Sequence, residues 1–203
     1  KMRIIEASTG KVMHEVQHGG WVRSVAWSPA GDLVATGSGD DKMRIIEAST
    51  GKVMHEVQHG GYLRSVAWSP AGDLVATESY DKKMRIIEAS TGKVMHEVQH
   101  GGDVMSVAYG GDVMSVAWSP AGDLVATASH DKEMRIIEAS TGKVMHEVQH
   151  GGWVISVAWS PAGDLVATGC PDKKMRIIEA STGKVMHEVQ HGGWVRSVAW
   201  SPA

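Results

Sequence analysis

The sequence contains no phenylalanine, a single cysteine, only six prolines and no long apolar run. One cysteine, Cys170, excludes a framework of intrachain disulfides and suits a reducing compartment, which favours the cytoplasm. No stretch approaches the roughly 18 apolar residues of a membrane-crossing helix, and we expect no signal peptide. The formal net charge is −3, and no basic cluster stands out. We therefore expect neither nucleic acid nor a membrane as a partner.

The main feature of the sequence is an internal repeat. The motif Met-Arg-Ile-Ile-Glu-Ala-Ser-Thr-Gly occurs five times, at a spacing of 41 residues with one exception of 50. The repeat units begin near residues 1, 42, 83, 133 and 174. A period near 40 indicates an array in which each unit buries its apolar face against its neighbours. We expect residues 1–203 to form a single domain.

Turn-forming residues divide each unit into four short segments rich in Val, Ile, Met and Trp. In order along one blade, we expect strand a at Val22–Trp27, strand b at Leu33–Thr36, strand c at Met2–Glu6 and strand d at Val12–Gln17. The Ser-Pro-Ala-Gly segment at 28–31 is typical of a type I turn. Four short strands in about 40 residues predict an all-β propeller of four-stranded antiparallel blades.

The segment Val-Arg-Ser-Val-Ala-Trp-Ser-Pro-Ala-Gly-Asp-Leu-Val-Ala-Thr-Gly-Ser-Gly-Asp at 22–40 resembles the WD40-repeat family, and the resemblance extends over essentially the whole chain. It implies a hydrogen-bonded tetrad of His, Asp, Ser or Thr, and Trp in each blade. By position, the His–Asp pairs would be His18 with Asp40, His59 with Asp81, His150 with Asp172, and His100 with Asp131. The family's Trp-Asp reads Ile46-Glu47 here. The tetrad is therefore incomplete, and we expect apolar packing to contribute more. Near-identical units indicate recent amplification or deliberate design.

The expected strands do not add up to five complete blades. The chain contains five c–d pairs and five in-register a strands, but four b strands, so the last blade lacks one strand. Propellers usually have four to eight blades. The chain therefore either closes an unusually small five-bladed ring or pairs with another copy to form a larger one. We favour a homo-oligomer that completes the ring, because an open array leaves strand edges exposed.

The exceptional spacing comes from a tandem duplication of nine residues within 101–118. Only one copy can serve as strand a of that blade. Either the other copy is a tolerated loop, or it is a spare strand that fills a gap elsewhere, including in a partner chain.

Each unit also carries a His-Glu-x-x-His motif, the pattern of zinc peptidases. The copies are His14–His18, His55–His59, His96–His100, His146–His150 and His187–His191. The motif binds zinc on a helix, whereas four residues of a strand span about 13 Å, so the two imidazoles could not meet one metal. We expect the second His to pair with the b–c Asp and the first to face outward. A zinc hydrolase is a remote alternative, and we assign no catalytic residue, metal or cofactor.

Differences between the units concentrate at the start of strand a and in the b–c turn, whereas the a–b and c–d turns do not vary. Antiparallel strands reverse at every turn, so the varied positions should share one face of the propeller, which we call the varied face. They are Trp21, Arg23, Tyr62, Arg64, Glu78, Tyr80, Asp112, Met114, His130, Trp153, Ile155, Trp194 and Arg196. Trp, Tyr and Arg are the residue types that anchor interfaces.

This pattern favours a non-enzymatic binding module that presents the varied face to a protein or peptide. The alternative is a structural scaffold whose function is self-assembly, with no specific ligand. Cys170 stands where other units have Ser38, Ser79 and Ser129, which indicates either a Ser-like residue at a strand end or a reactive thiol.

Overall fold

The computed structural model describes residues 1–101 and 113–201, and in these residues every regular element is a β-strand. The strands form one two-stranded sheet and four four-stranded antiparallel sheets. The two-stranded sheet contains β1 (Met2–Ile5) and β2 (Val12–Val16). The four-stranded sheets contain β3 (Val22–Trp27), β4 (Leu33–Ser38), β5 (Lys42–Glu47) and β6 (Val53–Gln58); β7 (Leu63–Trp68), β8 (Leu74–Ser79), β9 (Lys83–Glu88) and β10 (Val94–Gln99); β11 (Val113–Trp118), β12 (Leu124–Ser129), β13 (Glu133–Glu138) and β14 (Val144–Gln149); and β15 (Ser156–Trp159), β16 (Leu165–Gly169), β17 (Lys174–Glu179) and β18 (Val185–Gln190).

These bounds confirm the predicted blades. Strand a of the first unit matches β3 at both ends, and the other three strands of that unit differ by one or two residues at one end. Each four-stranded sheet keeps the sequence order a-b-c-d. The predicted type I turn is also present, because the Gly31 amide donates to the Ser28 carbonyl at 2.9 Å. Gly31 has a φ of +75°, a left-handed conformation that favours glycine.

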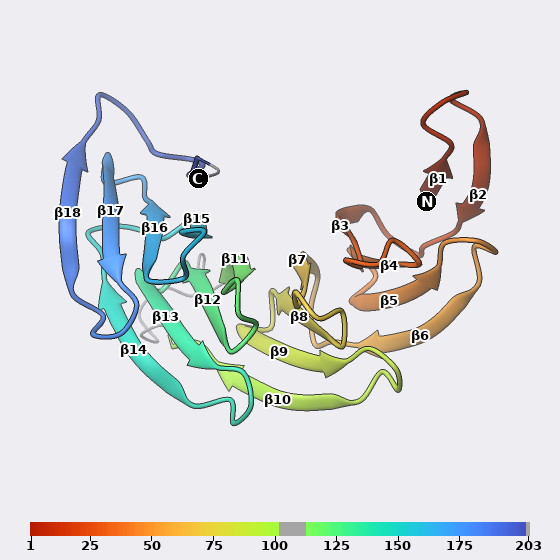
Figure 1. Cartoon of the computed structure of the whole chain (residues 1–203), viewed down its shortest axis with the longest axis horizontal. Coiled ribbons are helices and arrows are strands. Elements are labelled where there is room, and N and C mark those ends of the chain that lie inside the picture. Colours follow the sequence, from red (N-terminus) through yellow and green to blue (C-terminus); the bar gives the residue numbers. More distant parts are fainter. Residues whose placement is uncertain (102–112, 202–203) are drawn as a thin grey trace.

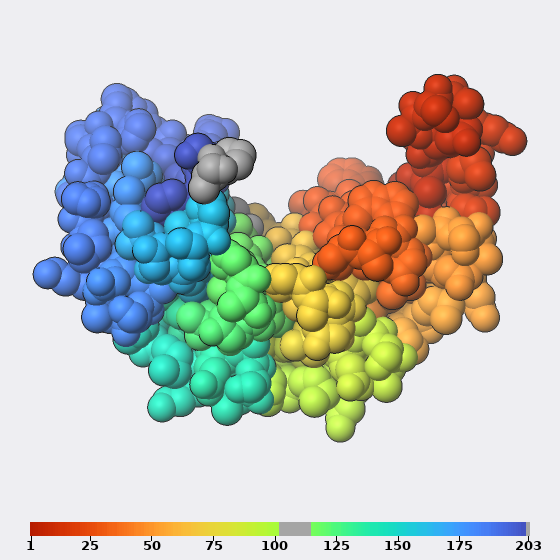
Figure 2. Space-filling view, in the orientation of Figure 1, coloured from red at the N-terminus to blue at the C-terminus, as the bar shows by residue number. Residues whose placement is uncertain are grey.

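The sheets stand side by side as blades along an arc, with the a strands on the inside and the d strands on the outside (Figure 1). The arc is open. The β1–β2 sheet lies at one end and the C-terminal segment at the other, and the two ends do not touch in the space-filling view (Figure 2). The small closed five-bladed ring, one of the two alternatives from the sequence, is therefore not formed.

The incomplete fifth unit is divided between the two ends of the arc. Its c and d strands are β1 and β2, which pair only with each other among the described strands. Its strand-a segment runs through Val195–Trp200 beside β15, where the Val198 amide donates to Ser156 Oγ at 3.2 Å. Without a strand b to pair with, this segment is not part of a sheet in the described residues.

The apolar core lies between neighbouring blades. One cluster joins Ala35, Met43, Ile45 and Val57 of one blade to Leu63, Val66, Trp68, Val75, Ile87 and Ala89 of the next. Two equivalent clusters follow along the arc. The b and c strands are buried on both faces, which explains their near-continuous apolar sequences. Each blade is therefore stabilised mainly by its neighbours, as expected for a repeat array.

Part of the duplicated segment lies within the described residues. The second copy supplies β11, at Val113–Trp118. Apart from Gly101, the first copy lies outside the described residues, so the choice between a loop and a spare strand stays a prediction.

Candidate interaction face

The varied positions of each unit meet because the d–a and b–c turns are hydrogen-bonded to each other. The Gly39 amide in a b–c turn donates to the Trp21 carbonyl at 2.8 Å. In the next unit, the Tyr80 amide donates to the Tyr62 carbonyl at the same distance. The two turns of a blade therefore lie on one face, as the strand reversals predict.

Along this face, side chains from neighbouring blades contact one another. The Arg23 guanidinium lies over the Tyr62 ring of the next blade, 5.6 Å from its centroid. Tyr62 and Tyr80 have ring centroids 6.1 Å apart, and Arg64 lies 5.5 Å from the Tyr80 centroid. Such cation–π contacts hold arginine and aromatic side chains in fixed relative positions.

The contacts continue into the later blades. The His130 ring stacks on Trp153 of the following blade, with centroids 4.5 Å apart. Burial lowers the pKa of His130, and the Arg64 charge lowers it further. At the end of the arc, Arg196 lies 5.4 Å from the Trp194 ring. We call the set Tyr62, Tyr80, His130, Trp153, Trp21 and Trp194 the aromatic row.

A small pocket opens at the start of this row. It has a volume of about 250 Å³ and is lined by Gly20, Trp21, Arg23, Gly39 and Tyr62. Trp21 is 81% exposed, the largest value among the exposed large apolar side chains that the structure describes. The pocket therefore combines an accessible indole, a phenol and a guanidinium, groups that hold a peptide side chain through stacking and hydrogen bonds.

Four of the predicted positions cannot be assigned to this surface from the described residues. Glu78 is fully buried at the end of β8, so its assignment to a ligand-contacting surface is wrong. Asp112 and the side chain of Met114 lie outside the described residues. Ile155 is half-buried beside Trp153 and contributes less surface than a turn residue.

Beneath the varied face, the His and the Thr of the expected tetrad bond to each other, whereas the Asp bonds to a residue outside the tetrad. The His18 imidazole bonds to Thr36 Oγ1 of strand b at 2.9 Å and faces the Val16 carbonyl at 3.2 Å. His59 and His150 bond to Thr77 and Thr168 in the same way. The predicted pairs His18–Asp40, His59–Asp81 and His150–Asp172 are therefore wrong, because a different cation binds each carboxylate.

That cation is an arginine on strand c, which the sequence analysis missed. The Arg44 guanidinium contacts Asp40 at 2.8 Å and Glu56 at 2.8 Å, and the pKa of Asp40 lies well below its usual range because of this arginine and the Gly19 amide. The equivalent residues are Arg85, Arg135 and Arg176. An arginine four residues after each b–c Asp was a detectable signal, since the pair recurs in every complete unit.

The unit beside the duplication is the exception. His100 lies 3.8 Å from Asp131, so this predicted His–Asp pair is present. Its Nδ1 also contacts Arg135, whereas the Thr127 hydroxyl has no hydrogen-bond partner among the described residues.

In four motifs the first His packs against the next blade and does not face outward, which corrects a second prediction, whereas His187 at the end of the arc is exposed as predicted. The His14 Nε2 lies 2.8 Å from the Ser49 carbonyl in the c–d turn of the next blade. His146 makes the same contact with Ser181 at 2.9 Å. The His-Glu-x-x-His pairs thus hold two different structural contacts. Within residues 1–101 and 113–201, no three His, Cys, Asp or Glu side chains gather as a metal ion requires.

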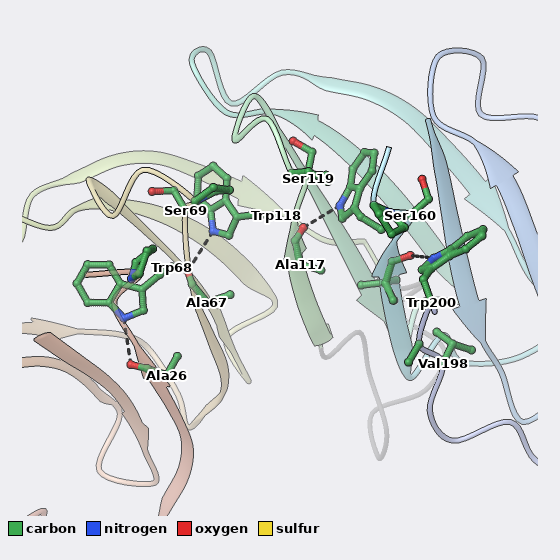
Figure 3. A pocket seen from close by; sticks show the side chains of 18 of the residues that line it. Ala26, Ala67, Trp68, Ser69, Ala117, Trp118, Ser119, Ser160, Val198 and Trp200 are labelled. Carbon is green, nitrogen blue, oxygen red and sulfur yellow. Dashed lines mark hydrogen bonds between the residues drawn. The ribbon is translucent and has the colours of Figure 1, made fainter. Parts of the chain in front are cut away.

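Inside the arc, a second concavity of about 780 Å³ is lined by unvaried residues of the a strands and a–b turns. Figure 3 shows the feature that organises it, a ladder of tryptophans. Each indole Nε1 donates to the carbonyl of an alanine in the preceding blade. The pairs are Trp68 with Ala26 at 3.0 Å, Trp118 with Ala67 at 3.0 Å, Trp159 with Ala117 at 3.1 Å and Trp200 with Ala158 at 2.9 Å.

Cys170 behaves as the Ser-like residue that its position predicts. Its Sγ accepts from the Asp172 amide at 3.5 Å, as the Ser79 hydroxyl accepts from the Asp81 amide. Burial raises the pKa of the Cys170 thiol to about 11, which disfavours the reactive thiolate.

The fold is that of a repeat protein whose blades form an open propeller. A family model described as the anaphase-promoting complex subunit 4 WD40 domain matches residues 3–62, 58–112, 108–153 and 147–203. The chain belongs to the WD40-repeat family. No curated protein matches it. Among solved structures it is similar to a chain of "Crystal Structure of Mitotic Checkpoint Complex", with a TM-score of 0.84 and 23% identity. That match covers 98% of this chain and 60% of the other, so this chain spans about three fifths of that length.

Across the described residues, no helix is long and apolar enough to cross a membrane.

Proposed function

We propose that this chain is a non-enzymatic interaction module that binds a protein or peptide on the varied face. WD40 propellers are in general protein-interaction modules, and this chain belongs to the WD40-repeat family. The matching family model and the similar solved structure are both named after multi-protein complexes. The assignment of binding to the varied face and its residues rests on the side-chain contacts along that face.

The observation that carries the proposal is the aromatic row. Arg23 and His130 each contact an aromatic ring of the following blade, and Tyr62 and Tyr80 contact each other within one blade, all on the one face where the units differ. These residue types dominate the energetics of interfaces, and rings already held in place lose little conformational freedom on binding. The opposite turns, which are identical in all units, offer no comparable set.

Tyr62 is the most informative single position, because it contacts both Arg23 and Tyr80 and lines the small pocket. We expect Tyr62→Ala to weaken binding of a peptide selected on this chain by at least about tenfold, which is ~1.4 kcal/mol. The peptide would come from a random library displayed on phage, and titration calorimetry would measure its affinity.

The matched control is Met54→Ala, which removes an exposed apolar side chain from β6 of the neighbouring blade. It should leave the affinity unchanged. Equal losses of affinity for both variants, or no loss for Tyr62→Ala, would show that the varied face is not the binding site.

A second candidate function is self-association, and the open arc favours it. An exposed blade edge in a repeat array normally has a polar capping unit, whereas here Trp27 at the first complete blade is 51% exposed. We expect light scattering after size exclusion to give a mass that is a multiple of the 21.7 kDa chain and falls on dilution. A mass of one chain at all concentrations would contradict this candidate.

A further inference from the structure

We propose that the small pocket beside Trp21 is a subsite for an acidic side chain, so that the peptide recognised on the varied face carries a carboxylate at this point. This inference rests on the proposed function and deepens it, because it names the chemistry of the ligand at the same site. A carboxylate is expected there although the chain as a whole has a net charge of −3.

The pocket is open because the first complete blade has a glycine in its b–c turn. A Cβ added at Gly39 would lie 3.5 Å from the Trp21 amide nitrogen and 3.9 Å from Arg23 Nε, so a larger side chain would project toward the guanidinium. In the next blade this position holds Tyr80, whose ring lies 5.5 Å from the Arg64 guanidinium. A glycine at position 39 therefore leaves the pocket open, and a ring would close it.

Arg23 lines this pocket without an acidic partner of its own. Its guanidinium lies 5.6 Å from the centroid of Tyr62, which belongs to the complete blade that follows. Among residues 1–101 and 113–201, Arg44 is ion-paired with both Asp40 and Glu56 at 2.8 Å, whereas Arg23 is ion-paired with no carboxylate. Arg23 is also exposed, so a ligand can reach it.

The acidic residues of the same turn do not neutralise Arg23. The Asp40 carboxylate accepts from the Gly19 amide at 2.8 Å and is bound by Arg44 at 2.8 Å. Asp41 follows it in the turn and is half-buried, and it forms no ion pair within the part of the chain that the structure describes. The positive charge of Arg23 is therefore left to a ligand.

Charge is also distributed unevenly between the two faces. In three of the four complete blades, the b–c turn adds a lysine to the varied face, at Lys82, Lys132 and Lys173. The turns of the opposite face carry one Asp, one Glu and one Lys in each of these blades, as in Asp73, Glu88 and Lys93, and are net negative. The net charge of the chain therefore does not describe the varied face, which favours an acidic partner.

A carboxylate matches the groups that line the pocket. A guanidinium that lies over a ring keeps its N–H edge for two parallel hydrogen bonds to a carboxylate. The contact with Tyr62 holds Arg23 in place, so less side-chain freedom is lost on binding. A cationic side chain would be repelled, and an apolar one would remove water from the guanidinium without pairing it. The volume of about 250 Å³ accommodates the side chain of Asp or Glu.

Peptides selected on this chain from a random phage-displayed library test the inference first through the peptide. We expect binders that require Tyr62 to be enriched in Asp and Glu. Replacing the critical acidic residue of such a peptide by its amide should weaken binding at least about tenfold, as titration calorimetry would measure. Arg23→Gln should cause a similar loss with the acidic peptide and little further loss with the amide peptide, because the two groups act as a pair.

A second variant tests the pocket without removing the charge. Gly39→Tyr gives the first blade the turn residue of the second, and the added Cβ would meet no atom closer than 3.5 Å, so the fold should be kept, as circular dichroism would check. We expect this variant to lose the acidic peptide as Arg23→Gln does. The matched control is Lys52→Gln, which removes an exposed positive charge from the opposite face and should leave the affinity unchanged.

Binders that require Tyr62 but keep their affinity as amides, or that bind Gly39→Tyr as tightly as the wild type, would overturn the acidic subsite while the varied face stands as the binding site. An equal loss in Lys52→Gln would also overturn it. Binding that does not depend on Tyr62, or a library without binders, would contradict the proposed function and this inference together. Displacement of the peptide by single-stranded DNA of equal charge would show a surface for polyanions in general and would overturn the inference.

Discussion

Replacing Trp118 by alanine is expected to lower the free energy of unfolding by about 3–5 kcal/mol. Trp118 is buried between two blades, and its indole donates to the Ala67 carbonyl at 3.0 Å. The substitution leaves a cavity in the inter-blade cluster and an unsatisfied carbonyl beside it. Because each blade depends on its neighbours, the loss should also reduce the cooperativity of unfolding. Urea unfolding followed by circular dichroism measures both effects.

The chain contains its own control for this experiment. Trp27 occupies the same position in an identical local sequence, but half of its surface is exposed and no preceding a strand covers it. Trp27→Ala should therefore change the stability of the monomer by less than about 1 kcal/mol. Similar losses for the two variants would mean that the tryptophans act within their own blades, and the inter-blade ladder would then have no energetic role.

Lowering the pH from neutral to about 4 is expected to destabilise the fold strongly. Burial lowers the pKa of His59 to about 4, with a further contribution from the Arg85 charge, and burial likewise lowers the pKa of His150 to about 4. An unfolded histidine titrates near 6.5, so between pH 6.5 and 4 the unfolded chain binds protons that the folded chain does not. The free energy of unfolding therefore decreases as the pH is lowered through this window, by up to about 3 kcal/mol for each of the two residues.

The aspartates contribute mainly below that window, and glutamates such as Glu97, whose pKa is lowered from 4.5 by its bond to Lys83, contribute only at its lower end. The pKa of Asp81 is lowered from 3.8, so the stability from its ion pair with Arg85 is lost only below that pH. Urea midpoints measured across the window should therefore follow the histidines. In His59→Gln the pH dependence should be smaller than in the wild type. His191→Gln, at the exposed copy of the same position, should leave it unchanged. A flat profile in the wild-type chain would contradict the assignment of neutral, buried histidines.

The blades could be predicted from the sequence because their determinants are local. Turn residues at fixed spacing, such as those at 28–31, and apolar segments between them specify strand positions to within two residues. The repeat period specifies the stacking of one blade on the next. The grouping of varied turns on one face followed from strand reversal alone, and the Gly39–Trp21 and Tyr80–Tyr62 hydrogen bonds show it.

The polar partners could not be predicted in the same way. His18, Thr36, Asp40 and Arg44 are close enough that several pairings are compatible with the sequence. The observed one follows from the charge and reach of Arg44, which takes the carboxylate and leaves the imidazole to the threonine hydroxyl. Glu78 was misplaced for a related reason, since its position at the end of β8 faces the core rather than the turn. The open arc depends on the angle between blades, which no single unit encodes.

Recognition by the varied face is tested most directly by comparing two multiple variants against a peptide selected from a random phage-displayed library. The first replaces Trp21, Tyr62, Trp153 and Trp194 by alanine, and the second replaces Met54, Met95, Met145 and Met186, which are exposed on the outer strands. The account predicts that the first variant keeps its circular dichroism spectrum and loses peptide binding, while the second binds as the wild type does. Retained binding in the first variant, or equal loss in both, would contradict it.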